Sequence, residues 1–497
     1  MAFSGLDLLV VAVLLAAAVF VLVRTSARGR GAGSYRGSGA RARQWLLDAS
    51  GANCENADLL LAKVCEECEQ LVRENPRHAF ALHVWGAALM LQARRAHGSE
   101  VDRLYALAEE KYTSALEITP SDASLRANRS IALMDLAVLH PGEDGCRYLA
   151  KVCDESERLA LENPRDAAAL HIWGAALMLQ ARSASDSEAD RLYERAEEKL
   201  ASALEITPGD TKLQADRTAA LVELADRHSG EEGRRCLMRA SQFCERLVSE
   251  DPSDPFGQTA LGSVLCRLAV RTSVPEADRL YAQAEERLAR ALDIAPGSDG
   301  ARLSLGLTLG RHARLHPGDD GDPLRTRANE LFDAVLRRNP FDREALRFRA
   351  VALWDRAGRS PGPETSRLLS EAVLQVDEAE RAGADSCTMA ETRGVLLWAQ
   401  ARCAGDETSA RLLQLAKEKF TQAESLKPRL CAYNLACVHA LLGESQACKR
   451  WLEISREPGL LVSCDQMATE PDLQAVWACQ WFRGLLDKGG LQPGADR

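Results

Sequence analysis

Aromatic side chains are scarce in this sequence: Phe, Trp and Tyr together make up 5% of the 497 residues. Sheets are built largely from aromatic and β-branched residues, so this scarcity argues against a β-rich fold. Ala, Leu, Arg and Glu are abundant instead, and these residues favour helices. The hydrophobic fraction of 46% excludes general disorder, because it is enough to build a core. We therefore expect an all-α protein.

An excess of basic residues is also absent. The chain holds 62 Lys and Arg residues against 72 Asp and Glu residues, which gives a net charge of −10. Nucleic-acid binders displace counterions from phosphates with a basic surface, and this composition does not favour one. We therefore expect no nucleic acid among the partners.

Disulfide, metal and catalytic patterns are missing as well. Fifteen Cys residues in so long a chain, an odd number, predict reduced thiols in a cytosol-like compartment. Cys65 and Cys68 form a single CxxC without a second pair, which fits two buried small residues better than zinc. The nine His residues do not cluster with carboxylates at ligand spacing, and no phosphate loop, GxSxG or HExxH is present. We expect no enzyme activity, no cofactor and no bound metal.

The first 23 residues differ from the rest. Leu8 to Val23 form an uncharged apolar run, and Arg24, Arg28 and Arg30 follow it, whereas Asp7 precedes it. A cleaved signal peptide has the opposite charge order, so the run predicts an uncleaved transmembrane anchor. The positive-inside rule then places the N-terminus across the membrane and the body on the cytoplasmic side.

A 44-residue internal repeat governs the remainder of the chain. Residues 83–93 read HVWGAALMLQA and residues 171–181 read HIWGAALMLQA, 88 positions apart. Prolines recur every 44 residues, with one missed slot at Ala384, and small residues recur halfway between them. The prolines are Pro76, Pro120, Pro164, Pro208, Pro252, Pro296, Pro340 and Pro428. The small residues are Ala108, Val152, Ala196, Ala240, Ala284, Ala328, Ala372 and Ala416.

Each unit reads as two helices. In the first clear unit, apolar residues at helical spacing predict one helix over 79–93 and a second over 103–118, joined by a polar stretch over 94–102. Proline closes the second helix, and Ser or Asp starts the next, as at Asp122, where a carboxylate can cap free N–H groups. A lone helical hairpin cannot bury both its faces, so neighbouring units must stack into a solenoid.

These residues resemble the tetratricopeptide repeat (TPR) superfamily. The resemblance pairs a small residue of the first helix with a large residue of the second, as in Gly86 and Tyr112, Gly174 and Leu200, Gly262 and Leu288, and Gly394 and Phe420. It implies a right-handed superhelix of hairpins. The family's unit has 34 residues, so we expect about ten extra residues between the two helices here. This long-loop form is similar to the repeats of the plant mitochondrial outer-membrane import receptor.

The sequence thus divides into six parts. They are a transmembrane anchor (1–23), a basic flexible linker (24–43), roughly nine TPR-like repeats (44–428), a shorter final unit (429–456), a C-terminal helical cap (457–487) and a tail (488–497).

In the TPR family the first helix of each unit lines a concave groove, and the resemblance nominates the residues that would face it. Two columns at the repeat spacing supply them, and the candidates are His83, Met90, Met134, His171, Met178, Trp354 and Trp398. Methionine is deformable and suits helical or extended peptides of varied sequence. The alternative is that these side chains pack between adjacent helices. If the groove is open, exchanging Met90, Met134 and Met178 for Glu abolishes partner capture without unfolding the array.

We therefore expect a membrane-anchored TPR-like scaffold or docking protein whose partners are other proteins and, through residues 1–23, the lipid bilayer. Two specific alternatives stay open: a receptor for proteins imported into an organelle, and a bacterial inner-membrane assembly factor. An enzyme-associated regulatory subunit is a third.

Overall fold

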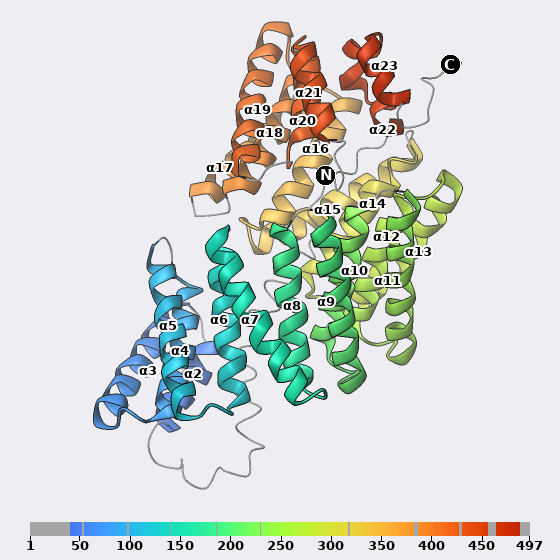
Figure 1. Ribbon diagram of the computed structural model, residues 1–497. Helices are drawn as coiled ribbons and strands as arrows, with labels where there is room; N and C mark the ends of the chain where they lie inside the picture. The colour runs from blue at the N-terminus through green and yellow to red at the C-terminus, as the bar shows by residue number, and fades with distance from the viewer. Residues whose placement is uncertain are drawn as a thin grey trace. The chain divides into compact units, whose positions relative to one another are not determined.

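The computed structural model describes residues 40–51, 54–96, 99–140, 142–184, 186–228, 230–316, 319–381, 386–426, 430–455 and 464–487. Within these residues the chain is helical throughout and contains no strand, which confirms the all-α expectation (Figure 1). It divides into two compact units at Leu221 and Val222, inside one helix.

In the residues that the structure describes, the first unit contains eight helices and the start of a ninth. They are α2 (Ala40–Gly51), α3 (Cys54–Glu74), α4 (Ala79–Ala93), α5 (Ser99–Ile118), α6 (Ala123–Leu139), α7 (Glu143–Glu162), α8 (Ala167–Ser183), α9 (Asp186–Ile206) and α10 (Thr211–Arg227), which crosses the boundary. Because α2 begins at Ala40, the end of the linker predicted over 24–43 is helical.

The second unit continues the pattern. Its helices are α11 (Gly230–Glu250), α12 (Pro255–Ala269), α13 (Val274–Ile294), α14 (Asp299–His312), α15 (Asp322–Arg338), α16 (Arg343–Arg359), α17 (Pro363–Arg381), α18 (Ser386–Arg402), α19 (Asp406–Leu426), α20 (Ala432–Leu441), α21 (Ser445–Ser455), α22 (Cys464–Thr469) and α23 (Gln480–Asp487). Two short 3-10 turns, η1 (Asp319–Gly321) and η2 (Pro471–Val476), complete it.

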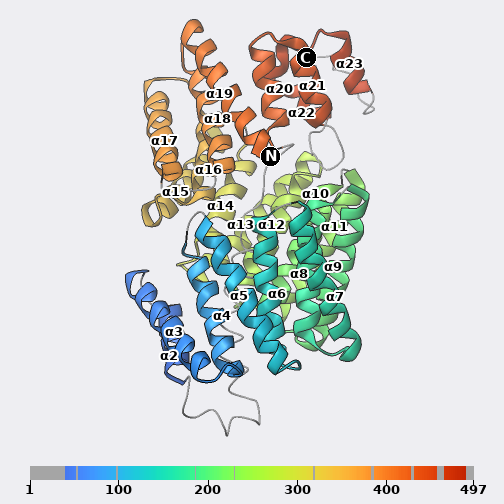
Figure 2. The ribbon, with the colours of Figure 1, turned by 60° about the vertical axis from the view of Figure 1, so that its left-hand side comes forward.

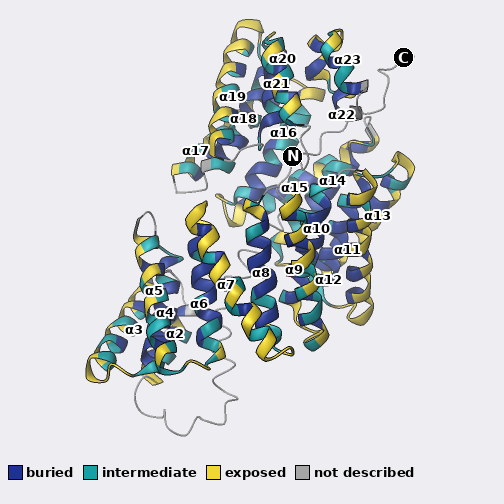
Figure 3. Ribbon diagram, viewed as in Figure 1, coloured by how far each residue is buried: buried dark blue, intermediate teal, exposed yellow. Residues whose placement is uncertain are grey.

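Each unit stacks its helices in two layers. Within each unit most consecutive helices contact one another, and several even-numbered helices also contact the next even-numbered helix, as α4 does α6 and α14 does α16 (Figure 2). The even-numbered helices are therefore enclosed by neighbours on several sides. Figure 3 shows the result for α8, which is buried along most of its length. An apolar sequence on all faces is what such a helix requires.

Glycine permits the close crossing of the two helices in a hairpin. A Cβ atom placed on Gly86 would lie 2.7 Å from Cε1 of Tyr112, and one on Gly394 would lie 2.5 Å from Cε1 of Phe420. The small residues of the second column, from Ala108 to Ala416, are all buried. The pairing of small with large residues expected from the repeat is therefore present.

The caps also follow the repeat. Asp122 accepts hydrogen bonds from the backbone N–H groups of Ser124 and Leu125, and Asp166, Asp254 and Asp342 cap their helices in the same way. A side-chain acceptor at this position satisfies N–H groups that have no partner within the helix.

The prediction of long loops between the two helices of each unit is wrong for the described residues. The polar stretch 94–102 was expected to connect its helices, but α5 already begins at Ser99. Elsewhere α8 ends at Ser183 and α9 begins at Asp186, and α9 has 21 residues. The extra residues of the 44-residue unit mainly lengthen the helices. Charged residues such as those near Asp102 continue a helix when one of its faces is solvated.

The transmembrane anchor predicted over 1–23 and the tail predicted over 488–497 lie outside the described residues. In the part of the chain that the structure describes, no helix combines the length and apolar character needed to cross a bilayer.

Candidate functional site

The three methionines nominated for a groove are buried between helices. Met90, Met134 and Met178 are 2%, 3% and 1% exposed, and the Tyr112 hydroxyl donates a hydrogen bond to the Met90 sulfur over 3.3 Å. The structure therefore places them in the core, as the packing alternative requires. A carboxylate at these positions would be desolvated, so we now expect the triple Glu exchange to unfold this unit.

The two nominated histidines lie in the same unit, and each contacts the next even-numbered helix. His83 Nε2 lies 2.9 Å from Asn128 Nδ2, and His171 Nε2 lies 2.5 Å from the buried carboxylate of Asp216. Burial lowers the pKa of His83 to about 4, so this side chain is neutral at pH 7. Both histidines therefore contact the neighbouring hairpin.

Trp354 and Trp398 are the nominated residues that reach a cavity. Their ring centroids are 5.4 Å apart, and both side chains line a cavity of about 580 Å³ in the second unit. Helices α14, α15, α16 and α18 form most of its wall, and residues of α20 and Glu470 complete it. The nominated set is thus split between the two units, and its C-terminal pair marks the candidate site.

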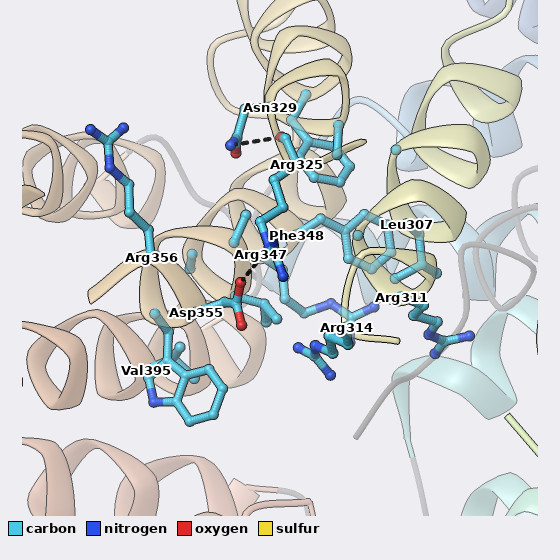
Figure 4. Close-up of a pocket in the computed structure, with 18 of the residues that line it drawn as sticks. Leu307, Arg311, Arg314, Arg325, Asn329, Arg347, Phe348, Asp355, Arg356 and Val395 are labelled. Atoms are coloured by element: carbon cyan, nitrogen blue, oxygen red, sulfur yellow. Dashed lines mark hydrogen bonds and ion pairs between the residues drawn. The ribbon is translucent and has the colours of Figure 1, made fainter. Parts of the chain in front are cut away.

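Arginines dominate the charged lining of this cavity. Six arginines face four acids, and the positive charges are in excess. The arginines are Arg311, Arg314, Arg325, Arg347, Arg356 and Arg359, and the acids are Asp322, Asp355, Glu391 and Glu470. Apolar side chains, including Leu307, Phe332, Phe348, Val351 and Val395, fill the space between them. Figure 4 shows several of these residues converging from α14, α15 and α16.

The two aspartates of the cavity are already neutralised. Asp322 lies 3.1 Å from both Arg325 and Arg359, and Asp355 lies 3.1 Å from Arg359 Nε and 3.6 Å from Arg325 Nε. By contrast, Arg311, Arg314 and Arg356 form no ion pair with any described residue. Arg311 Nη1 donates to the Cys266 sulfur over 3.6 Å, so the guanidinium groups of Arg314 and Arg356 are the ones that remain available to an anion.

The indole N–H groups are the second polar feature. Nε1 of Trp354 and Nε1 of Trp398 are buried, and neither finds a hydrogen-bond acceptor among the described side chains and backbone. The Arg402 guanidinium covers the faces of both rings, with 4.2 Å to the Trp354 centroid and 5.6 Å to that of Trp398. Arg402 is held in turn by Asp472. A buried donor without an acceptor is costly, and a ligand oxygen would relieve that cost.

Glu470 and Tyr433 are two titratable groups of the wall whose pKa is raised by burial. Burial raises the pKa of the Glu470 carboxyl, and the neighbouring Asp472 carboxylate raises it further. Burial likewise raises the pKa of the Tyr433 hydroxyl. Both shifts favour the neutral forms, which leaves the arginines as the dominant charges in the cavity.

Sequence reasoning missed Arg311, the arginine of α14 that lines the cavity, and its repeat column does not single it out. The column that follows the methionine column reads Leu91, Asp135, Leu179, Glu223, Arg267, Arg311, Asp355 and Ala399, so charged residues occur in it along the whole array.

The structure brings together a histidine and carboxylate cluster that no local spacing in the sequence indicates. Asp278, His312 and His316 bring three possible ligand atoms within 4.8 Å of one another. No local spacing motif reveals this cluster, because Asp278 lies on a different helix from the two histidines.

No family model matches the chain, and no curated protein is significantly similar to it in sequence. Solved structures similar to it include a tetratricopeptide repeat protein from Parabacteroides merdae, at 14% identity, 73% of this chain and 98% of that one, with a TM-score of 0.35. Yeast Tom70 is 14% identical over 90% of this chain and 95% of its own, with a TM-score of 0.37.

A monomeric mutant of IFIT1 bound to Gppp-AAAA is also similar, at 14% identity, 83% of this chain and 99% of that one, with a TM-score of 0.30. All three TM-scores are below 0.5.

Proposed function

We propose that the chain is a protein-interaction scaffold that docks an acidic segment of a partner in the cavity of the second unit. One observation carries the proposal: three arginines without ion pairs and two indole donors without acceptors line the same cavity of about 580 Å³. Arginine recognises carboxylates through paired N–H groups, and such charge-assisted bonds are strong.

The cavity favours an acidic peptide over a polyphosphate chain. Its wall combines arginines with apolar residues such as Leu307 and Phe348, and a phosphate backbone would leave the apolar residues unused. A peptide that alternates carboxylate and apolar side chains satisfies both parts of the wall.

The volume limits what enters. Cavities of roughly 300–1,000 Å³ hold a drug-sized ligand, which corresponds to a few residues of a peptide. Arg311 of α14 and Arg314, which follows α14, would receive carboxylates, and Trp354 and Trp398 would donate to further oxygens of the ligand.

Fluorescence anisotropy of labelled peptides tests this proposal. The probe alternates Glu and Leu over ten residues, and the comparison peptide has Gln at every Glu position. We expect the acidic peptide alone to bind, with an affinity that falls as salt is added, because charges at the cavity mouth are screened. Arg314→Glu weakens binding by about ten-fold or more, since it removes one charge-assisted bond and adds repulsion.

The control is Arg337→Glu. Arg337 is exposed on α15, outside the cavity, and its replacement changes the net charge equally. If both variants lose the same binding affinity, the effect comes from the net charge of the protein and not from the cavity, which would contradict the proposal. Equal binding of the Gln peptide, or tighter binding of a single-stranded RNA ten-mer, would also contradict it.

We propose in addition that residues 1–23 anchor the scaffold in a membrane with the repeats on the cytoplasmic side. Support comes from the uncharged run between Leu8 and Val23 and the arginines that begin at Arg24. Alkaline carbonate extraction of cell membranes tests this: we expect the full chain to stay in the membrane pellet and a chain lacking residues 1–23 to be released. Release of both would refute the anchor and leave the docking cavity unaffected.

A further inference from the structure

Two histidines and an aspartate converge where two consecutive hairpins meet. His312 is the last residue of α14, His316 follows in the next turn, and Asp278 lies on α13. His312 Nε2 is 3.0 Å and His316 Nε2 is 2.8 Å from the same oxygen, Asp278 Oδ1. Three atoms of the types that bind transition metals thus face one point.

Two residues of α13, Glu285 and Tyr281, hold the imidazole ring of His312 in its orientation. Its Nδ1 lies 2.6 Å from Glu285 Oε1, and its ring stacks on Tyr281 with 5.4 Å between centroids and 24° between planes. A carboxylate that accepts from the far nitrogen is the usual support of a metal-binding histidine, because it sets which nitrogen is free to coordinate. His312 is also buried, whereas Asp278 and His316 are partly open to solvent.

We propose that Asp278, His312 and His316 bind a Zn²⁺ ion, with water completing the coordination. Zinc prefers imidazole nitrogen and carboxylate oxygen at roughly 2.0–2.2 Å, so tetrahedral ligands sit about 3.3 Å apart. The two distances to Asp278 Oδ1, 3.0 Å and 2.8 Å, are close to that value. All three ligand atoms lie within 4.8 Å of one another, so small movements of the partly open Asp278 and His316 side chains would admit the ion.

The repeat supplies an internal comparison. One and two 88-residue periods earlier, Asp190 with His228 and Asp102 with His140 occupy the positions of Asp278 with His316. His140 Nε2 lies 3.2 Å from Asp102 Oδ1, so the pair itself recurs. The position of His312 is Leu224 and Leu136 in those copies. A single histidine therefore turns a recurring ion pair into a three-ligand cluster at one place in the array.

A bound ion would join α13 to the end of α14. These helices belong to consecutive hairpins, which are otherwise held by side-chain packing. An ion that binds the folded state alone stabilises it in proportion to the logarithm of its concentration over Kd. Zinc would thus link two neighbouring repeats and stabilise their contact.

The test uses the untagged full chain in detergent, stripped of metal with a chelator. Zn²⁺ is titrated by calorimetry, and Co²⁺ is added separately as a spectroscopic probe. We expect one zinc site and a cobalt spectrum typical of nitrogen and oxygen ligands. His316→Ala should weaken zinc binding by ten-fold or more, and His312→Gln by at least as much. His140→Ala is the matched control, because it removes a histidine from the equivalent pair, and it should bind zinc as the unaltered chain does.

Three results would overturn the proposal. They are no zinc binding by the unaltered chain, equal binding by His316→Ala and His140→Ala, and near-ultraviolet cobalt bands of thiolate ligands, which would assign the ion to cysteines instead. Thermal melting without metal distinguishes loss of the site from loss of the fold. His316→Ala and the unaltered chain should have the same Tm when no metal is present. Added zinc should raise the Tm of the unaltered chain and leave that of His316→Ala unchanged.

Discussion

The Arg325 guanidinium donates a hydrogen bond from Nη2 to the backbone carbonyl of His316 over 3.1 Å. The same nitrogen donates to the carbonyl of Ala313 over 2.7 Å. Arg325 also lines the cavity, where its Nε lies 3.6 Å from Asp355. One side chain therefore binds two carbonyls of the segment that follows α14 and at the same time lines the docking cavity.

Replacing Arg325 should destabilise the second unit. Arg325→Met keeps the length of the side chain but removes the guanidinium donor from both carbonyls, and the Ala313 carbonyl then keeps only the backbone N–H of His316. We expect the free energy of unfolding to fall by about 1–3 kcal/mol, the usual cost of a lost bond to a charged group. Urea denaturation followed by circular dichroism measures it. Arg337→Met is the control. If it lowers the free energy of unfolding by the same amount, the two hydrogen bonds of Arg325 do not account for the loss.

Two glycines of α14 should respond to alanine in opposite directions. A Cβ on Gly306 would lie 2.5 Å from Cε1 of the buried Phe332, whereas a Cβ on Gly310 would have nothing within 4 Å. We expect Gly306→Ala to destabilise the fold by about 1–3 kcal/mol through overpacking. Gly310→Ala should stabilise it by up to about 1 kcal/mol, because alanine loses less entropy in a helix. Thermal denaturation of both variants measures these changes. A lower Tm for Gly310→Ala would contradict the open space beside Gly310.

The buried His83 should make the first unit less stable in mild acid. Its pKa is lowered to about 4 in the folded state, chiefly by burial. The unfolded chain takes up a proton near pH 6.5, and the folded chain does so only near pH 4. The unfolding free energy should therefore fall as the pH drops through this window, by up to about 3 kcal/mol.

His83→Gln provides the comparison for that pH dependence. Glutamine cannot titrate but can still accept a hydrogen bond from Asn128, the partner of His83. The urea midpoint of this variant should change less between pH 7 and pH 5 than that of the unaltered chain. Equal changes would mean that His83 is not the group that titrates.

The repeat comparison predicts that a second zinc site can be built. Leu136→His places a histidine beside His140 and Asp102, at the position that His312 holds in the later copy. Calorimetry should then count two zinc ions per chain instead of one. A count of one for this variant, with its helical content retained, would show that the geometry around His312 does not transfer between copies.

The helices, caps and crossings could be predicted because the repeat displays each of them many times. Asp122 and its equivalents cap helices, and Gly86 meets Tyr112, at positions fixed by the 44-residue spacing. Backbone geometry forces these choices locally, so the sequence pattern is sufficient for them.

The candidate site was only partly predictable, because burial depends on neighbours that sequence spacing does not identify. Met90 and Trp354 occupy the same repeat column, yet Met90 is packed against Tyr112 and Trp354 lines a cavity. The difference arises where small and charged residues of α14, such as Gly310, stand in place of larger apolar ones. The cluster around Asp278 needs two helices to be in contact, and no linear motif encodes that contact.

Hydrogen exchange of the full chain, with and without the Glu and Leu peptide, tests the docking cavity most directly. We predict slower exchange in the segments that line it, residues 306–329, 347–360 and 391–398, and no change in α4 to α9. Protection confined to α4 to α9, or no protection at peptide concentrations well above Kd, would contradict the account.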